Sequence, residues 1–202
     1  MVTNYLTPPD ILLQIKKGKR LPHLIHSQAK KAGEEYFDIL IHSNAFQTEL
    51  SGEETSLNKF KSNHADVIVG NPPWGSPAVD DSEGRLALNI AMKWCDDRSY
   101  PTSDMELSQA FLWRAYELLK DKGTAGMLVS SGILLKQSIK SNIFKQKWIN
   151  LITLKEVGNF VHVRDVFFNG AISPFLSVVF TKAEPHPNSF VDYWTARRTK
   201  II

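Results

Sequence analysis

Cysteine is nearly absent from this sequence of 202 residues, which contains only Cys95. A single cysteine excludes a disulfide framework within the chain and offers no thiol cluster for a metal. No apolar run reaches the length of a membrane-spanning helix, and the first residues lack the apolar core of a signal peptide. We therefore expect a cytoplasmic protein that has neither a metal site nor contact with a membrane.

Apolar residues are present in sufficient number for a substantial core, since 43% of the side chains are hydrophobic. A chain of this length forms one domain or most of one. The formal net charge of +3 permits nucleic-acid binding but does not indicate it, because many globular domains carry a similar charge. The patterns divide the chain into a basic segment 1–35, a main body 36–182 and a tail 183–202.

The most informative segment is a short apolar stretch that ends in prolines. Residues 65–70 are typical of a buried strand, and Asn71-Pro72-Pro73-Trp74, here called the NPPW loop, turn the chain sharply away from it. Each proline fixes its own φ and lacks an N–H group, and the second proline also restricts the first. We expect a stiff loop at the carboxyl end of a strand, which is where ligands bind in open α/β sheets.

Such a loop suits a planar ring that carries an amino group. Trp74 offers a face for stacking, and stacking of a base on an aromatic ring contributes roughly 1–3 kcal/mol. The side-chain oxygen of Asn71 and the carbonyl of Pro72 could accept the two amino protons, which would make a poor nucleophile competent. A proline-rich turn with a core tryptophan, or a polyproline-type ligand segment, would explain the prolines but not the preceding strand.

Residues 66–74 resemble motif IV of S-adenosylmethionine-dependent amino-methyltransferases, whose signature is (D/N/S)PP(Y/F/W). More narrowly, most of the chain resembles the large bacterial adenine-N6 DNA methyltransferases of restriction–modification and related phage-defence systems. The resemblance implies that Asn71 and Pro72 bind the target adenine N6, within a catalytic loop that includes Pro73. It also implies that Trp74 stacks on an adenine flipped out of double-stranded DNA. The cofactor would be S-adenosylmethionine, and no metal would be needed.

The same resemblance suggests residues on the cofactor side of the site. A strand at 37–42 would lead into motif III, where Asn44 meets the adenine of the cofactor and Phe46 packs beside it. An ordinary strand-to-loop asparagine would explain Asn44 equally well. Phe111 lies in a segment that resembles motif V and could line the cofactor pocket, although its place in the helical apolar stripe 107–119 is typical of a core residue.

A second aromatic site is suggested by residues 165–170, which resemble motif VIII. In relatives, an aromatic ring of this motif contacts the flipped base on the side opposite the motif IV ring. Phe167 is the better match and Phe168 is the alternative. A position at the edge of the core remains open for both rings.

The resemblance implies an α/β fold, namely part of a Rossmann-like methyltransferase domain with a mixed sheet. Strands are expected at 125–130, and at 151–157 and 174–180, which would pair as the antiparallel end of the sheet. Helices are expected at 86–94 and 107–119. Ser103 would cap the second helix, with Glu106 closing the capping box.

Relatives carry a glycine-rich cofactor loop on their first strand and an acidic residue for the ribose on the second, and this sequence contains neither. Residues 36–182 are therefore expected to be the second half of a catalytic domain that lacks the first cofactor-binding strands. The missing N-terminal half would be lost or supplied by a separate chain, and the exposed sheet edges predict poor solubility. The tail 183–202 would lead towards an absent target-recognition region.

Site-specific adenine-N6 methylation of DNA is thus the expected function, although the isolated chain could be inactive. An amino-methyltransferase acting on RNA or on a protein glutamine remains an alternative, because the same tetrapeptide serves any planar amino group. A non-catalytic remnant or an assembly subunit is the third possibility, and the missing cofactor loop favours it.

Overall fold

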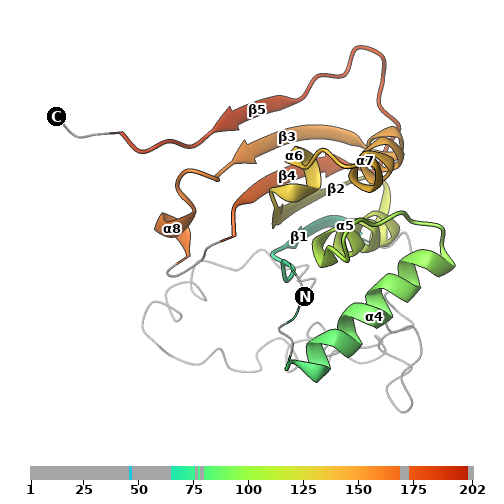
Figure 1. The fold of residues 1–202 in the computed structure, drawn as a ribbon. Helices are drawn as coiled ribbons and strands as arrows, with labels where there is room; N and C mark the ends of the chain where they lie inside the picture. The colour runs from blue at the N-terminus through green and yellow to red at the C-terminus, as the bar shows by residue number, and fades with distance from the viewer. Residues whose placement is uncertain (1–45, 47–64, 76, 78–79, 169–172, 200–202) are drawn as a thin grey trace, which may run out of the picture.

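The computed structural model describes residues 46, 65–75, 77, 80–168 and 173–199 (Figure 1). The basic segment 1–35, the expected strand 37–42 and Asn44 lie outside the described residues.

Five strands form a single mixed sheet in the order β1-β2-β4-β3-β5 (Figure 1). β1 (Ala65–Gly70) runs parallel to β2 (Leu119–Ser130), whereas β4 (Phe175–Thr181) is antiparallel to both β2 and β3 (Thr153–Asn159). This confirms the expected α/β class, the mixed sheet and the antiparallel pairing of the last two predicted strands. β5 (Asp192–Thr195) was expected only as tail, and it pairs with β3 in parallel. The antiparallel pair is therefore not the outermost part of the sheet.

Helices connect the strands, and Asp81 shows how the first of them begins. These helices are α4 (Ser82–Asp97), α5 (Leu107–Leu118), α6 (Gly132–Leu135), α7 (Ile139–Leu151) and α8 (Arg164–Phe167). The Asp81 carboxylate accepts a 2.8 Å hydrogen bond from the Gly84 N–H, which satisfies a free donor of the first turn of α4. No helix in the described part of the chain has the length and apolar composition needed to cross a membrane.

The expectation that Ser103 caps α5 is wrong. Glu106 occupies the N-cap position, and its side chain makes no capping hydrogen bond. Ser103 instead binds Gln109, whose amide accepts from the Ser103 N–H at 2.7 Å and donates to the Ser103 hydroxyl at 2.8 Å. Asp104 and Met105 both have a positive φ, so the backbone turns between Ser103 and the helix rather than entering it directly.

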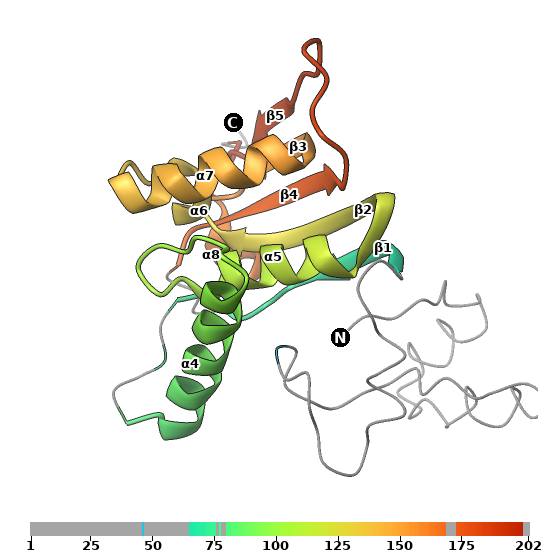
Figure 2. The same ribbon diagram turned by 90° about the vertical axis from the view of Figure 1, so that its right-hand side faces the viewer.

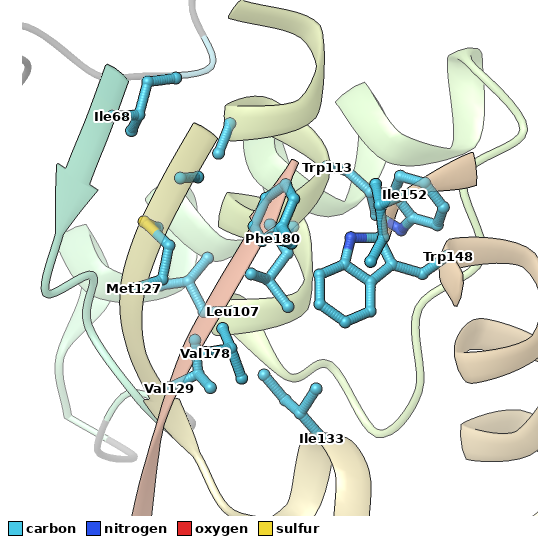
Figure 3. Packing of buried hydrophobic residues seen from close by; sticks show 14 of the residues in the cluster. Ile68, Leu107, Trp113, Met127, Val129, Ile133, Trp148, Ile152, Val178 and Phe180 are labelled. Atoms are coloured by element: carbon cyan, nitrogen blue, oxygen red, sulfur yellow. The ribbon is translucent and has the colours of Figure 1, made fainter. Parts of the chain in front are cut away.

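One face of the sheet carries the core. Along β2, Ala125, Met127 and Val129 are buried and alternate with partly exposed residues, as expected for a strand that is covered on one side. Figure 3 shows their neighbours Val178 and Phe180 of β4 beside apolar side chains from α5, α6 and α7. In the side view of Figure 2, α5 and α7 lie on the same side of the strands.

Candidate active site

The NPPW loop begins where β1 ends, and its residues differ in exposure. Pro72 is buried, whereas Asn71 and Pro73 are exposed. Gly75 follows with a φ of +76°, a conformation that glycine adopts without strain. The Gly75 N–H points to a carboxylate oxygen of Glu106, 3.4 Å away, which ties the end of the loop to the start of α5. The loop therefore presents the Asn71 amide to solvent while its backbone is anchored on both sides.

The indole of Trp74 is held by a backbone group of the neighbouring strand. Its Nε1–H donates a 3.1 Å hydrogen bond to the carbonyl of Leu128. Gly70, the last residue of β1, pairs with Met127, so Leu128 is the next residue along β2. The indole N–H thus continues the hydrogen bonding of β2 beyond the point where the backbone of β1 has turned away.

Three aromatic rings lie nearly parallel next to the NPPW loop, and we call Trp74, Phe175 and Phe160 the aromatic stack. The Trp74 and Phe175 centroids are 5.2 Å apart with an interplanar angle of 23°. Phe160 covers the other side of Phe175, at 5.0 Å and 9°. Offset packing of this kind stabilises aromatic pairs beyond the burial of their surface.

The two phenylalanines expected near the base lie at this stack, at the end of the short helix α8. Phe168 meets Trp74 edge-on, with centroids 5.6 Å apart. Phe167 is edge-on to Phe160 at 5.1 Å and keeps 57% of its surface exposed. The fold therefore brings the segments that resemble motifs IV and VIII together, although Phe168 is the ring that touches Trp74. The position of α8 beside the ends of the strands is visible in Figure 1.

A groove of about 390 Å³ begins at Asn71 and runs across the strands. Its lining is mainly apolar and consists of residues of three strands and the loop: Val69, Gly70, Asn71, Gly126, Met127, Leu128, Ser177, Val178 and Val179. Gly126 leaves the groove open, since a Cβ atom at this position would meet nothing within 4 Å.

On the cofactor side, the structure brings Phe46 and Phe111 into contact. Their rings are edge-on with centroids 4.8 Å apart, and Phe46 also packs edge-on against Trp94 at 5.4 Å. Phe46 is only 5% exposed and Phe111 is partly buried, so both belong to the apolar packing around α4 and α5. The contact places both rings in the core packing, and the described residues do not complete a site for S-adenosylmethionine.

The pKa values of two groups near Trp94, the Cys95 thiol and the Tyr100 hydroxyl, are raised, so both stay protonated at neutral pH. Burial, with a smaller contribution from Asp96, raises the pKa of the Cys95 thiol to about 12. Burial and the Glu117 carboxylate likewise raise the pKa of Tyr100 to about 12. Among the described residues, no group of three His, Cys, Asp or Glu side chains is arranged to hold a metal ion.

Sequence reasoning missed Phe175 as a neighbour of Trp74, and Phe160 as the ring that packs on Phe175. Phe175 begins an apolar strand and is therefore indistinguishable from a core residue in the sequence. The antiparallel pairing expected for strands 151–157 and 174–180 could have indicated this contact. It places Phe160, just after the first strand, opposite Phe175 at the start of the second. The structure has this arrangement, with the Phe160 N–H bonded to the Phe175 carbonyl at 3.2 Å.

Two comparisons with known proteins find methylases of restriction systems. The family model described as Eco57I restriction-modification methylase matches residues 10–167. The methylase subunit of the type I restriction enzyme EcoEI of Escherichia coli is 27% identical over 175 residues, which are 83% of this chain. The chain spans only 30% of the length of that relative.

Two solved structures are similar to part of this chain. The methyltransferase subunit of a type I restriction-modification system of Streptococcus thermophilus has a TM-score of 0.49 and 16% identity, over 76% of this chain and 29% of that chain. A Listeria monocytogenes protein assigned to the class I S-adenosylmethionine-dependent methyltransferases has a TM-score of 0.47 and 12% identity, over 67% of this chain and 38% of that one.

Proposed function

This chain belongs to the Eco57I restriction-modification methylase family, and from that membership we propose that it carries the target-base side of a DNA methyltransferase site. The reaction is transfer of a methyl group from S-adenosylmethionine to adenine N6 in double-stranded DNA, in the cytoplasm, as part of a restriction–modification or defence system. The observation that carries the proposal is the NPPW loop at the end of β1, where an exposed Asn71 lies near a fixed Trp74.

The chemistry at this loop concerns the two protons of the amino group. The Asn71 side-chain oxygen and the Pro72 carbonyl accept hydrogen bonds from the two N–H groups. These bonds draw electron density onto N6 and direct its lone pair away from the ring. Trp74 stacks on the base after the base leaves the duplex. S-adenosylmethionine, when bound, would supply the methyl group from its positively charged sulfur. N6 would take this group directly as the carbon–sulfur bond breaks, without a covalent enzyme intermediate, and would then release one of its protons to solvent.

We assign the second aromatic contact to Phe167. Phe168 already packs against the edge of Trp74, whereas Phe167 lies in the same cluster with 57% of its surface exposed. The exposed ring of Phe167 is available to contact a base. The ring of Phe168, which packs against Trp74, instead holds Trp74 in place.

The cofactor site requires elements beyond those that this chain supplies. Phe46 and Phe111 provide one wall for the cofactor adenine, and the glycine-rich loop comes from an N-terminal half or a separate chain. We expect full activity only when that half is present, because a cofactor bound to one apolar wall would lack partners for its charged groups.

The test is methyl transfer by the methylase that contains this chain, with Asn71→Ala as the variant. Loss of a preorganised hydrogen-bonding group in an active site lowers rates by about 100-fold or more, and we expect a loss of this size. Affinity for DNA should stay nearly unchanged, because Asn71 acts on the extruded base only. Radiolabelled transfer and a DNA-binding titration measure the two effects.

Asn150→Ala is the matched control, since Asn150 is an exposed asparagine near the end of α7. A normal transfer rate in Asn71→Ala would contradict the mechanism. Comparing duplex DNA, RNA and protein as acceptors separates DNA methylation from the other amino-methyltransferase reactions. Binding of neither DNA nor S-adenosylmethionine by the folded chain would favour a non-catalytic subunit.

A further inference from the structure

We propose that Phe175 is a positioning residue that fixes the plane of the Trp74 indole before any base is bound. The proposal rests on the function proposed above, in which Trp74 is the platform for the target adenine. It concerns how that platform is kept in place, and it assigns this task to a residue outside the NPPW loop.

Phe175 can act in this way because its own ring is immobilised on both faces. It is only 2% exposed and lies between Trp74, at 5.2 Å, and Phe160, at 5.0 Å. Phe168 also packs against its edge at 5.3 Å. Phe167 is edge-on to it at 6.1 Å. A ring enclosed by four others has little room to rotate, so its orientation is passed on to the indole stacked on it.

The hydrogen bond from the Trp74 indole to Leu128 is not sufficient for this purpose. One bond fixes the position of the indole nitrogen, but the ring can still pivot about that point. Stacking on Phe175 removes the pivot, because a rotation would separate the two rings. Together with the edge contact of Phe168, these two contacts hold the indole at one position and in one plane, which is the preorganisation that a stacking platform needs.

The experiment follows the indole N–H of Trp74 by NMR in the ¹⁵N-labelled chain, and needs neither DNA nor cofactor. The resonance of Trp74 is identified by its disappearance in Trp74→Phe. Its solvent-exchange rate is then compared between the wild type and Phe175→Leu. We expect exchange to become faster by about fivefold or more, because a pivoting ring breaks its hydrogen bond more often.

Phe144→Leu is the matched control. Phe144 is fully buried and stacks on a different tryptophan, Trp148, at 5.9 Å and 15°. This substitution should destabilise the core by a similar amount and leave the exchange rate of Trp74 unchanged. The Trp113 indole, bonded to the Pro101 carbonyl at 2.9 Å, is the internal reference in Phe175→Leu, and its rate should not change.

An exchange rate of Trp74 that stays within about twofold of the wild type in folded Phe175→Leu would overturn the proposal. An equal acceleration of Trp74 in Phe144→Leu would also overturn it, because the effect would then be a general loss of stability. If Phe175→Leu does not fold, Phe160→Leu replaces it, since Phe160 is partly exposed and supports the other side of Phe175. Exchange of the Trp74 indole is then expected to become faster in Phe160→Leu, and an unchanged exchange rate would overturn the proposal.

This outcome is independent of the methyl-transfer test. A methylase that acts on another substrate would still show a Trp74 indole held by Phe175. Conversely, if Phe175→Leu leaves the exchange rate of the Trp74 indole unchanged while the methylase is active, the proposed function stands and only the role assigned to Phe175 is wrong.

Discussion

The thiol of Cys95 illustrates how burial alters a single residue. Its side chain is buried on α4, and desolvation raises its pKa from 9.0 to about 12. The folded state therefore binds the thiol proton more tightly than the unfolded state does. The resulting stabilisation is complete below pH 9 and is lost as the pH rises from there towards 12.

We predict that alkaline pH weakens the wild-type protein more than Cys95→Ala. Between pH 8 and pH 10, the free energy of unfolding should fall by about 1 kcal/mol more in the wild type, because only its unfolded state gains a thiolate. Urea unfolding at the two pH values measures the difference. Lysine and tyrosine titrations affect both proteins equally, so an identical pH dependence would contradict the raised pKa of Cys95.

The residues of the NPPW loop could be predicted from sequence because their chemistry is local. Two prolines after an apolar strand dictate a stiff loop whatever surrounds it, and an asparagine and a tryptophan flank those prolines. The bond from the Trp74 indole to Leu128 could not be predicted, since it depends on β2 extending past the end of β1. Phe175 was missed for a similar reason, because only the folded sheet places it beside Trp74.

At the scale of elements, β5 pairs with β3 through the backbone and is also fixed by side-chain contacts. The aromatic stack reaches β5 through Phe160, which packs edge-on against Trp194 at 5.1 Å. The Trp194 indole N–H donates to Glu156 at 3.0 Å, and the Asn159 amide donates to the Tyr193 hydroxyl at 2.7 Å. Gly158 permits this packing, because a Cβ there would lie 2.5 Å from a ring atom of Trp194.

We predict that Gly158→Ala loosens β5 and lowers stability by about 1–2 kcal/mol, since the new methyl group would lie 2.5 Å from a ring atom of Trp194 and from the Ser177 hydroxyl oxygen, and both must shift. Hydrogen exchange of the β5 amides and urea unfolding measure the two effects. Gly126→Ala is the control in a nearby strand, where a Cβ meets nothing within 4 Å, and it should leave the amides of β5 unaffected. Equal effects of both substitutions would show that strand propensity, and not the Trp194 contact, is responsible.

The elements differ in how well the sequence indicated them. β1 and β4 are mainly apolar runs, and β3 is rich in residues that favour strands; the expected bounds of each agree with the observed ones within two residues. β5 is short and exposed, and therefore lacks the apolar pattern that marks a strand. The start of α5 was misjudged because Ser103 satisfies the capping pattern, while Gln109 competes for its hydrogen bonds through a contact that only the folded turn allows.

At the scale of the whole molecule, the described sheet has one covered and one less covered face. The helices α5 and α7 cover the face that carries the core, whereas Val67 and Val69 of β1 are 57% and 72% exposed. β1 is also the outermost strand on its side of the described sheet. Sheets with parallel strands normally have both faces covered, and exposed apolar strands at an edge promote association.

We therefore predict that this chain self-associates through β1 and the adjoining groove, and that Val69→Lys reduces the association. A lysine at a position 72% exposed should change the free energy of unfolding by less than about 0.5 kcal/mol, while its charge opposes edge-to-edge pairing. Sedimentation velocity over a series of concentrations measures the effect. Leu86→Lys on α4, at 62% exposure, adds the same charge away from the sheet and should leave association unchanged. If both lysines reduce association equally, net charge rather than the exposed side chains of β1 controls it, and this face of the described sheet is not the surface that brings copies together.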